Sequence, residues 1–256
     1  MQYQCLIYEK DADIARITLN TPKSLNALGL TMVKELLEVL EDAGKDSAIK
    51  VIVLAGTGKA FSAGGDVALM EQGLSANDAR AWIDDIGKVI LGIASMEKLV
   101  IASVSGIAYG AGCNLALACD FIAASEESKF CEVFANIGLV PDGGGTYLLP
   151  RLIGLARARE LLFTARAITA QEAKDIGMIQ YVVPGNELAD FVRELAQKLA
   201  KTSSPATGIT KKLLFQGFVQ DFGQALDKEA VFQSLCMETE EHKKRIKDFF
   251  DKKKKN

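Results

Sequence analysis

Three glycine-rich segments contain the residue types best suited to chemistry on a bound ligand: residues 58–66, 105–114 and 138–146. Small residues allow a ligand to approach the main chain closely. Residues 111–118 have a helical pattern, so the N–H groups near Ala111 are expected at a helix N-terminus. Such groups are unpaired within the helix and lie at the positive end of its dipole. They can therefore hold an oxygen that carries negative charge.

Asp142 is the acid of interest beside these segments, because it directly precedes the three glycines at 143–145. An aspartate at this position could also cap the helix that follows, which is a structural role. The segments are not a nucleotide-binding P-loop, since no Gly-Lys-Ser/Thr ends them, and no GxGxxG motif opens the first helix.

The first two glycine-rich segments each follow a short apolar run, at residues 51–54 and 100–104, and another such run occupies 121–124. Runs that are apolar on both faces are typical of strands buried between layers. Residues 14–19 form a further β-rich run, which ends in the turn signal Asn20-Thr21-Pro22. The order of elements predicts an α/β protein with repeated strand-then-helix units.

The helical signals dominate the second half of the chain. Helices are predicted at 32–43, where Gly44 is a stop signal, at 157–163, and at 170–175 before Gly177, with a last strand at 179–183. Ser203, Ser204 and Pro205 form a helix start signal, and the pattern stays helical to Lys252. We therefore expect an α/β core at residues 1–200 and a helical C-terminal region at residues 201–256.

Composition excludes several classes of function. The chain has 49% hydrophobic and 25% charged residues with a net charge of −3, which argues against a nucleic-acid or membrane surface. No apolar stretch is long enough to span a bilayer, and no N-terminal leader is evident. The single histidine, His242, lies near the C-terminus, which disfavours His-based zinc sites and Ser-His-Asp triads. Five cysteines without a CxxC pair suggest free thiols in a reducing cytoplasm.

Taken together, the three segments resemble the crotonase superfamily, the enoyl-CoA hydratase/isomerase family. The resemblance covers essentially the whole chain, through residues 20–28, 61–66, 106–120, 141–154 and 248–252. It implies a spiral of ββα turns followed by a helical trimerisation region, and a homotrimer or dimer of trimers. It also implies an acyl-CoA thioester substrate, with coenzyme A entering as part of that substrate, and no separate cofactor or metal.

The resemblance assigns roles by position. Gly65 and Ala111 match the two oxyanion-hole amides, and the alanine keeps its N–H although many relatives have glycine there. Two fixed donors stabilise a thioester enolate without solvent reorganisation. Phe249 and Lys252 match tail positions that contact coenzyme A, often from a neighbouring subunit. The residues that match the adenine pocket are Ala63, Gly64, Asp66 and Val67.

The carboxyl positions depart from the hydratase pattern. The two hydratase glutamates fall on Asn114 and Phe134, so neither is present at its position. Several branches carry an acid where Asp142 lies, and the segment is most similar to the enoyl-CoA isomerase group of bacterial phenylacetate degradation. Glu132, two residues from Phe134, is out of register but could share a face with it if the stretch is extended.

One carboxylate can move a double bond, because it removes a proton from one carbon and returns it to another. Hydration needs an activated water, and Asn114 can hold a water but cannot accept its proton. The pattern therefore favours isomerisation, and an apolar pocket should raise the pKa of Asp142 above roughly 3.9. The alternatives are an enoyl-CoA hydratase, a ring-forming or thioester-cleaving relative, and a non-catalytic CoA or RNA binder on the same fold.

Overall fold

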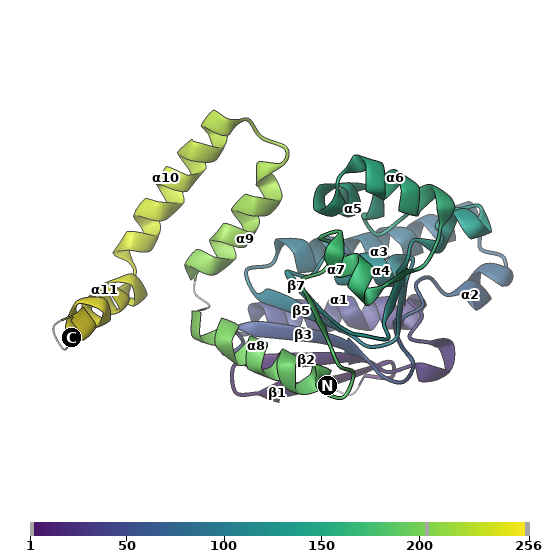
Figure 1. Cartoon of the computed structure of the whole chain (residues 1–256), viewed down its shortest axis with the longest axis horizontal. Coiled ribbons are helices and arrows are strands. Elements are labelled where there is room, and N and C mark those ends of the chain that lie inside the picture. Colours follow the sequence, from purple (N-terminus) through teal and green to yellow (C-terminus); the bar gives the residue numbers. More distant parts are fainter. Residues whose placement is uncertain (1–2, 203–204, 254–256) are drawn as a thin grey trace.

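The computed structural model describes residues 3–202 and 205–253 as an α/β core with an arm of helices beside it (Figure 1). In the main sheet β1 pairs antiparallel with β2, and the remaining pairs are parallel. In sheet order its strands are β1 (Leu6–Asp11), β2 (Ile14–Leu19), β3 (Val51–Gly56), β5 (Leu99–Val104), β7 (Phe121–Ser125) and β10 (Tyr181–Val183). The α/β class predicted from the sequence is confirmed.

A smaller sheet lies beside the main one, and from β3 to β8 successive strands alternate between the two. Its strands are β4 (Ala60–Ser62), β6 (Ile107–Tyr109), β8 (Lys129–Cys131) and β9 (Ile168–Thr169). The pairs β3–β4, β5–β6 and β7–β8 each place one strand in each sheet, and a helical segment follows each pair. This is the spiral of ββα turns that the resemblance implied.

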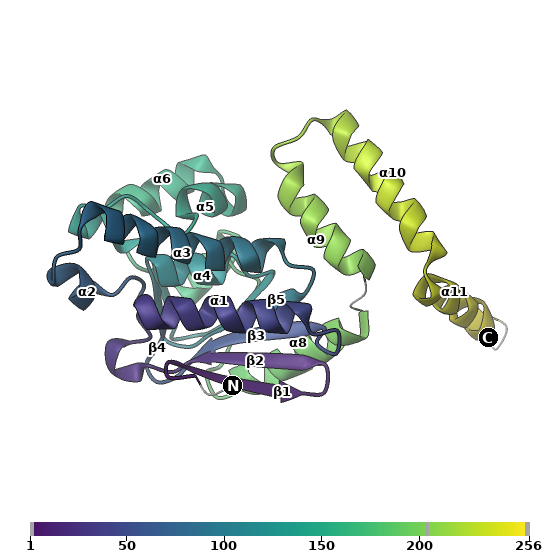
Figure 2. The same ribbon diagram turned by 180° about the vertical axis from the view of Figure 1, so that it is seen from behind.

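The central strands are buried on both faces, which explains their wholly apolar sequences. Val51 and Val53 of β3 pack against α8 (Leu188–Thr202), whereas Ile52 and Leu54 belong to the larger core with α1 (Leu30–Lys45) and α3 (Ala76–Ser95). Successive side chains of a strand point to opposite faces, so one short apolar strand packs against the helices on both sides of the sheet. Figures 1 and 2 show α8 on one side of the sheet and α1 with α3 on the other.

The other helical segments agree in place with most of the sequence predictions. They are η1 (Pro22–Ser24), α2 (Val67–Glu71), α4 (Ala111–Leu117), η2 (Val133–Ile137), α5 (Gly145–Ile153), α6 (Leu155–Thr164), α7 (Ala170–Asp175), α9 (Pro205–Gly217), α10 (Phe222–Glu238) and α11 (Glu240–Lys253). Helix α9 begins at Pro205, and the serines predicted to cap it lie outside the described residues. The last strand is shorter than predicted and starts at Tyr181.

The predicted stop at Gly44 is wrong, because α1 continues through it to Lys45. A Cβ at this glycine would meet nothing within 4 Å, so neither close packing nor a tight turn requires glycine at position 44. Packing of the α1 apolar face on the core outweighs the low helix propensity of one glycine. Helix α3 was not predicted at all, although Ser75 caps its first turn by accepting a hydrogen bond from Asp78 N.

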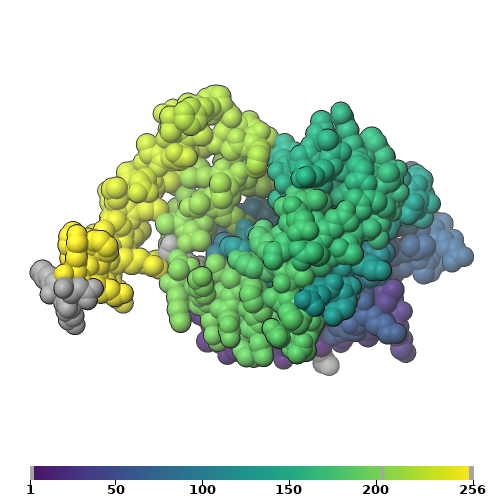
Figure 3. All heavy atoms as spheres, viewed as in Figure 1, coloured from purple at the N-terminus to yellow at the C-terminus, as the bar shows by residue number. Residues whose placement is uncertain are grey.

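Helices α9, α10 and α11 form an arm that leaves the core, as the space-filling view also shows (Figure 3). Lys211 anchors α9, since its buried ammonium donates to Asp120 Oδ2 at 2.7 Å and to the Lys98 carbonyl at 2.9 Å. Burial raises the pKa of Asp120, and the charge of Lys211 opposes that rise. The ion pair therefore fixes the start of the arm against the strand β5.

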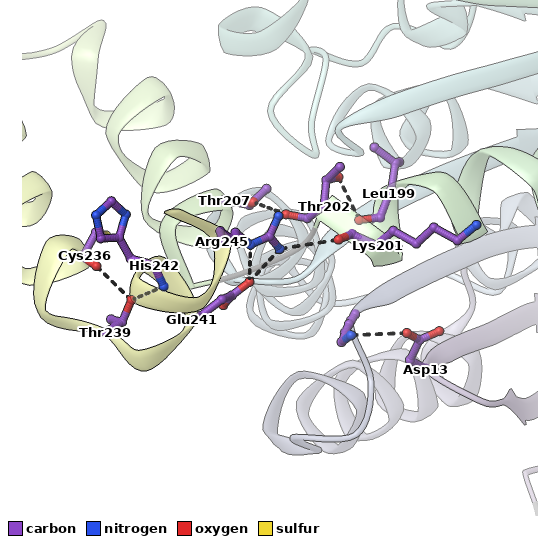
Figure 4. A network of polar contacts seen from close by, with 11 residues as sticks. Asp13, Leu199, Lys201, Thr202, Thr207, Cys236, Thr239, Glu241, His242 and Arg245 are labelled. Carbon is purple, nitrogen blue, oxygen red and sulfur yellow. Dashed lines mark hydrogen bonds and ion pairs between the residues drawn. The ribbon is translucent and has the colours of Figure 1, made fainter. Parts of the chain in front are cut away.

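The far end of the arm returns to the end of α8. Arg245 pairs with Glu241 at 2.6 Å and donates to the Lys201 carbonyl at 3.4 Å (Figure 4). His242 lies in the same network, where its main-chain N–H donates to the Thr239 hydroxyl. All five cysteines are free thiols. Within the described residues no helix has both the length and the apolar composition needed to cross a membrane.

Candidate active site

The first two glycine-rich segments meet because β4 and β6 are parallel neighbours, so the loops after them leave the same edge of the small sheet. Gly64 has a φ of +92°, and a Cβ there would lie 2.5 Å from the Tyr109 carbonyl oxygen and 3.2 Å from Ala111 N. A Cβ on Gly112 would lie 2.5 Å from the Ser62 carbonyl oxygen. Only glycine allows these two main-chain approaches.

The amides of Gly65 and Ala111 are left available by this arrangement. Ala111 is the first residue of α4, so its N–H has no acceptor within the helix. Among the described residues, neither amide donates a hydrogen bond to another protein atom. Two unpaired N–H groups on adjoining loops are the donors that a developing oxyanion requires.

A third loop fixes the segment after β4. Asn26, fully buried with a φ of +56°, donates from its side chain to the carbonyl oxygens of Thr57 and Ala60 at 2.9 and 2.8 Å. The Ser62 hydroxyl donates to the Asn26 carbonyl at 2.8 Å, and Leu28 N donates to the Gly64 carbonyl at 2.7 Å. Asparagine tolerates the left-handed conformation, which accounts for this residue type at this turn.

Asp142 lies in the loop between η2 and α5 and does not cap the helix. The N-cap of α5 is Gly144, and no side chain bonds to the first turn. The Asp142 main-chain carbonyl accepts from Gly145 N at 3.1 Å and from Asn114 Nδ2 at 2.8 Å. Its buried Oδ1 has no donor among the described residues, and burial raises the pKa of the carboxyl to about 6. The Asp142 side chain therefore does not cap α5, which was the structural alternative considered for it.

Asn114 and Glu132 lie beside Asp142. Asn114, on α4 and fully buried, places Nδ2 3.4 Å from Glu132 Oε2 as well as on the Asp142 carbonyl. Glu132 follows β8 and is only 2% exposed. Burial, with the charge of Asp142 adding to it, raises the pKa of Glu132 to about 7. The site thus has a second buried carboxyl, Glu132, although the sequence motif places the hydratase glutamate two residues later, at Phe134.

Phe134 takes a different position from the one considered for an extended strand. Strand β8 ends at Cys131, and Phe134 lies in the 3-10 helix η2. Its ring is buried against Gly110, with Cζ 3.6 Å from the position of a Cβ there. Phe134 therefore forms an apolar wall beside the Ala111 amide and does not share a face with Glu132.

Helix α3 packs against the loop that carries Asp142. Ile86 and Ile90 lie within 3.7 Å of the Cβ position of Gly143, the residue after Asp142. Their buried side chains, with Trp82 one turn earlier, show the helical spacing that could have predicted α3. The apolar surroundings explain why the pKa of the Asp142 carboxyl is raised.

The residues matched to the adenine pocket follow β4 directly. Asp66 caps α2 by accepting from Ala68 N at 3.0 Å and Leu69 N at 3.2 Å, and Val67 is 62% exposed. Ala63 is half-buried and donates from N to the Leu25 carbonyl. A cavity of about 280 Å³ adjoins Asp66 between α1 and α2.

Phe249 and Lys252 are not brought to this site within one chain. Both lie on α11, at the opposite end of the molecule from α2 (Figure 1). Phe249 is 59% exposed. Any contact of these residues with a ligand at Gly65 therefore requires another copy of the chain.

Comparison with known proteins identifies the family. The model of the enoyl-CoA hydratase/isomerase family matches residues 9–256. A crotonyl-CoA hydratase of Syntrophomonas wolfei is 37% identical, covering 100% of this chain and 98% of its own length. A 1,2-epoxyphenylacetyl-CoA isomerase of Escherichia coli is 32% identical, covering 93% of this chain and 92% of its own.

Solved structures agree with the sequence comparison. The crystal structure of an enoyl-CoA hydratase from Bacillus anthracis superposes with a TM-score of 0.92 at 31% identity, covering 97% of each chain. The relatives named above include both a hydratase and an isomerase, so likeness alone does not distinguish the two reactions. The chain belongs to the enoyl-CoA hydratase/isomerase family and is an enzyme of that family.

Proposed function

We propose that this enzyme is an enoyl-CoA double-bond isomerase in which Asp142 transfers the proton. One observation carries the proposal: the buried carboxyl of Asp142 does not cap helix α5 and has a pKa of about 6. Asn114 and Phe134 occupy the positions of the two hydratase glutamates. A carboxyl that titrates near neutrality is suited to act as base and then as acid in one turnover.

The amides of Gly65 and Ala111 hold the thioester oxygen in this proposal. Removing a proton from the carbon next to a thioester leaves negative charge on the carbonyl oxygen. Two preorganised N–H donors stabilise that charge in a site that excludes water, where hydrogen bonds to charge are stronger than in water. The same donors also orient the acyl chain so that its reacting carbons lie near the carboxyl.

The proton balance requires only one acid–base group. The Asp142 carboxylate removes a proton from the carbon between the carbonyl and the double bond of a 3-enoyl-CoA. The electron pair moves into a dienolate, and the neutral carboxyl returns the proton to the far carbon. The product is the conjugated 2-enoyl-CoA, and Asp142 is again ionised.

Hydration is the second candidate, and a specific observation favours it. Glu132 is a buried carboxyl next to Asn114, and an amide with a carboxyl can hold a water and accept its proton. The crotonyl-CoA hydratase of Syntrophomonas wolfei is named for this reaction. Glu132 would then be the group that activates the water.

We expect purified wild-type enzyme to isomerise 3-enoyl-CoA faster than it hydrates 2-enoyl-CoA. Both rates can be followed on substrates of equal chain length by the absorbance of the conjugated thioester and by product chromatography. Calorimetry with an acyl-CoA gives the binding control. Hydration that outpaces isomerisation would favour the second candidate, and no acyl-CoA binding would refute both.

The substrate's coenzyme A moiety is proposed to lie along Ala63, Gly64, Asp66 and Val67. Its binding is further proposed to involve Phe249 and Lys252 of a neighbouring copy, because α11 is remote from α2 in one chain. This geometry makes the assembly part of the active enzyme.

We expect a homotrimer or a dimer of trimers. The arm exposes large apolar side chains and forms an open groove of about 780 Å³ between α9 and α10, and contiguous exposed apolar surface marks a protein–protein contact. The exposed residues include Leu214, Phe218, Phe222, Leu226, Val231 and Leu235. Light scattering at micromolar concentration checks the mass, and a monomer would contradict both the assembly and the cross-subunit contact.

A further inference from the structure

Three buried oxygens in the active site have no donor among the described residues: Asn114 Oδ1, Glu132 Oε1 and Asp142 Oδ1. Asn114 Nδ2 lies between the other two residues, 3.4 Å from Glu132 Oε2 and 2.8 Å from the Asp142 carbonyl. A buried acceptor without a donor is destabilising, and a proton on one of the two carboxyls would supply a donor here.

A single proton on Glu132 Oε1 would satisfy two of the three oxygens. A neutral carboxylic acid and a carboxamide form two antiparallel hydrogen bonds, N–H to one carboxyl oxygen and O–H to the amide oxygen. The first contact is the one between Asn114 Nδ2 and Glu132 Oε2. The second would join the two atoms left without a partner, Glu132 Oε1 and Asn114 Oδ1.

Electrostatics favours the same proton. Ionising two carboxyls that share one buried site costs more than ionising either one alone. Burial raises the pKa of Asp142 to about 6. Burial raises the pKa of Glu132 to about 7, against hydrogen bonds from Cys113 and Asn114 that lower it and with a smaller contribution from the charge of Asp142. Between about pH 6 and 7 the proton therefore resides mainly on Glu132 while Asp142 is mainly charged.

The other titratable groups around Glu132 do not change charge in this range. Burial raises the pKa of the Cys113 thiol on α4 well above its usual value, and that of Cys131 on β8 to about 11. Arg166 lines a small cavity with Glu132, but Glu160 and Glu172 hold its guanidinium in ion pairs. The other lining residues of that cavity are apolar: Phe130, Leu149, Leu161, Ile168 and Met178.

We propose that Glu132 is a positioning residue, which as a neutral acid locks the Asn114 amide onto the Asp142 loop and so holds the Asp142 carboxylate for proton transfer. If Glu132 is ionised, its carboxylate and the Asn114 Oδ1 are both acceptors, and a second charge is added beside Asp142. The Asn114 amide is then no longer held in place, and turnover falls. This inference rests on the proposed role of Asp142 as the base.

The test is the pH dependence of kcat/KM for wild type and Glu132→Gln. Glutamine donates to and accepts from Asn114 as the neutral acid does, but it cannot ionise. We expect the kcat/KM of the wild type to follow a bell-shaped pH profile, with limbs near the pKa values of Asp142 and Glu132 given above. By pH 8 its kcat/KM should have fallen about tenfold. Glu132→Gln should keep the acid limb and lose the alkaline one. Glu132→Met, which has similar bulk and no hydrogen bond, should turn over slowly at every pH.

Either of two results would overturn the proposal: a wild-type profile that stays flat to pH 8, or an alkaline limb that persists in Glu132→Gln. The profile can be measured on whichever reaction the enzyme performs. Loss of the proposed isomerase role would instead appear in the ratio of isomerisation to hydration and in the Asp142→Asn variant. The two failures are therefore distinguishable.

Thermal unfolding supplies a readout that does not depend on turnover. The folded pKa of Glu132 lies above its ordinary value of 4.5, so its stabilising contribution is present at low pH and is lost as pH rises toward about 7. Between pH 5 and 8 the Tm of wild type should fall relative to Glu132→Gln by about 3 °C or more. Equal Tm shifts in the two proteins would refute the buried proton.

An infrared titration of the wild type keeps the test open even if the variant does not fold. A protonated carboxyl has a carbonyl stretch that a carboxylate lacks, and Glu132 should lose this band near neutral pH. Absence of a protonated-carboxyl band between pH 5 and 7 would contradict the proposal on the native enzyme alone.

Discussion

Replacement of Asp142 by asparagine is expected to lower isomerase turnover by about 10²-fold or more, because it removes the group that carries the proton. The structure predicts little else to change. The main-chain contacts of Asp142 with Asn114 and Gly145 do not involve its side chain, and Gly144 rather than Asp142 is the helix N-cap. Folding and acyl-CoA affinity should therefore be retained.

The measurement compares single-substrate kinetics with calorimetric affinity for an acyl-CoA. Asp175→Asn is a matched control, since Asp175 is an exposed aspartate on α7 whose Oδ1 accepts from Gln171 at 2.7 Å, an interaction that asparagine keeps. It should leave both quantities unchanged. A folded Asp142→Asn enzyme with near wild-type isomerisation would show that another group transfers the proton.

The second large effect is expected from Ala111→Pro, which removes one oxyanion-hole donor and little else from the main chain. Ala111 is the first residue of α4, a position at which proline is accepted because its N–H has no helical partner. Loss of one such donor costs roughly 10²–10³-fold in kcat. The ring also occupies the space into which the N–H points, which adds to the loss.

Ala111→Gly is the matched control, because it shortens the same side chain but keeps the N–H. It should retain most of its turnover at a small cost in stability. Free coenzyme A, which lacks the thioester, should bind both variants like the wild type. A folded Ala111→Pro enzyme that turns over normally would mean that this amide does not stabilise the transition state.

The parts of the fold set by local pattern could be predicted from the sequence. The buried strands β3, β5 and β7 were identified because each is a short apolar run, and β2 because it is a β-rich run that ends in a turn signal. Helix α1 was identified too, but not its end, since packing on the core outweighs the propensity of Gly44. The short strands of the second sheet have two or three residues, too few to show a period.

The site was predictable where it depends on main chain and register. The loops of Gly65 and Ala111 meet as expected, because each follows a strand of one parallel pair. The place of Glu132 was not predictable, because a 3-10 helix begins directly after it and the extended stretch in which it could share a face with Phe134 is not formed. The capping role of Asp142 could be rejected only when the φ of +82° at Gly144 showed where α5 begins.

The close approach of Gly64 to Ala111 has a consequence for how this scaffold can diversify. Because the groups proposed to stabilise charge are main-chain amides, almost no side-chain replacement removes them, whereas a Cβ at Gly64 would separate the two loops. Positions 132, 134 and 142 lie on other segments than these amides, and position 114 lies three residues after Ala111 on α4, so their side chains can vary while the main-chain amides stay. Evolution or design can thus exchange one acyl-CoA reaction for another by moving a carboxyl, while the enolate-holding machinery is inherited unchanged.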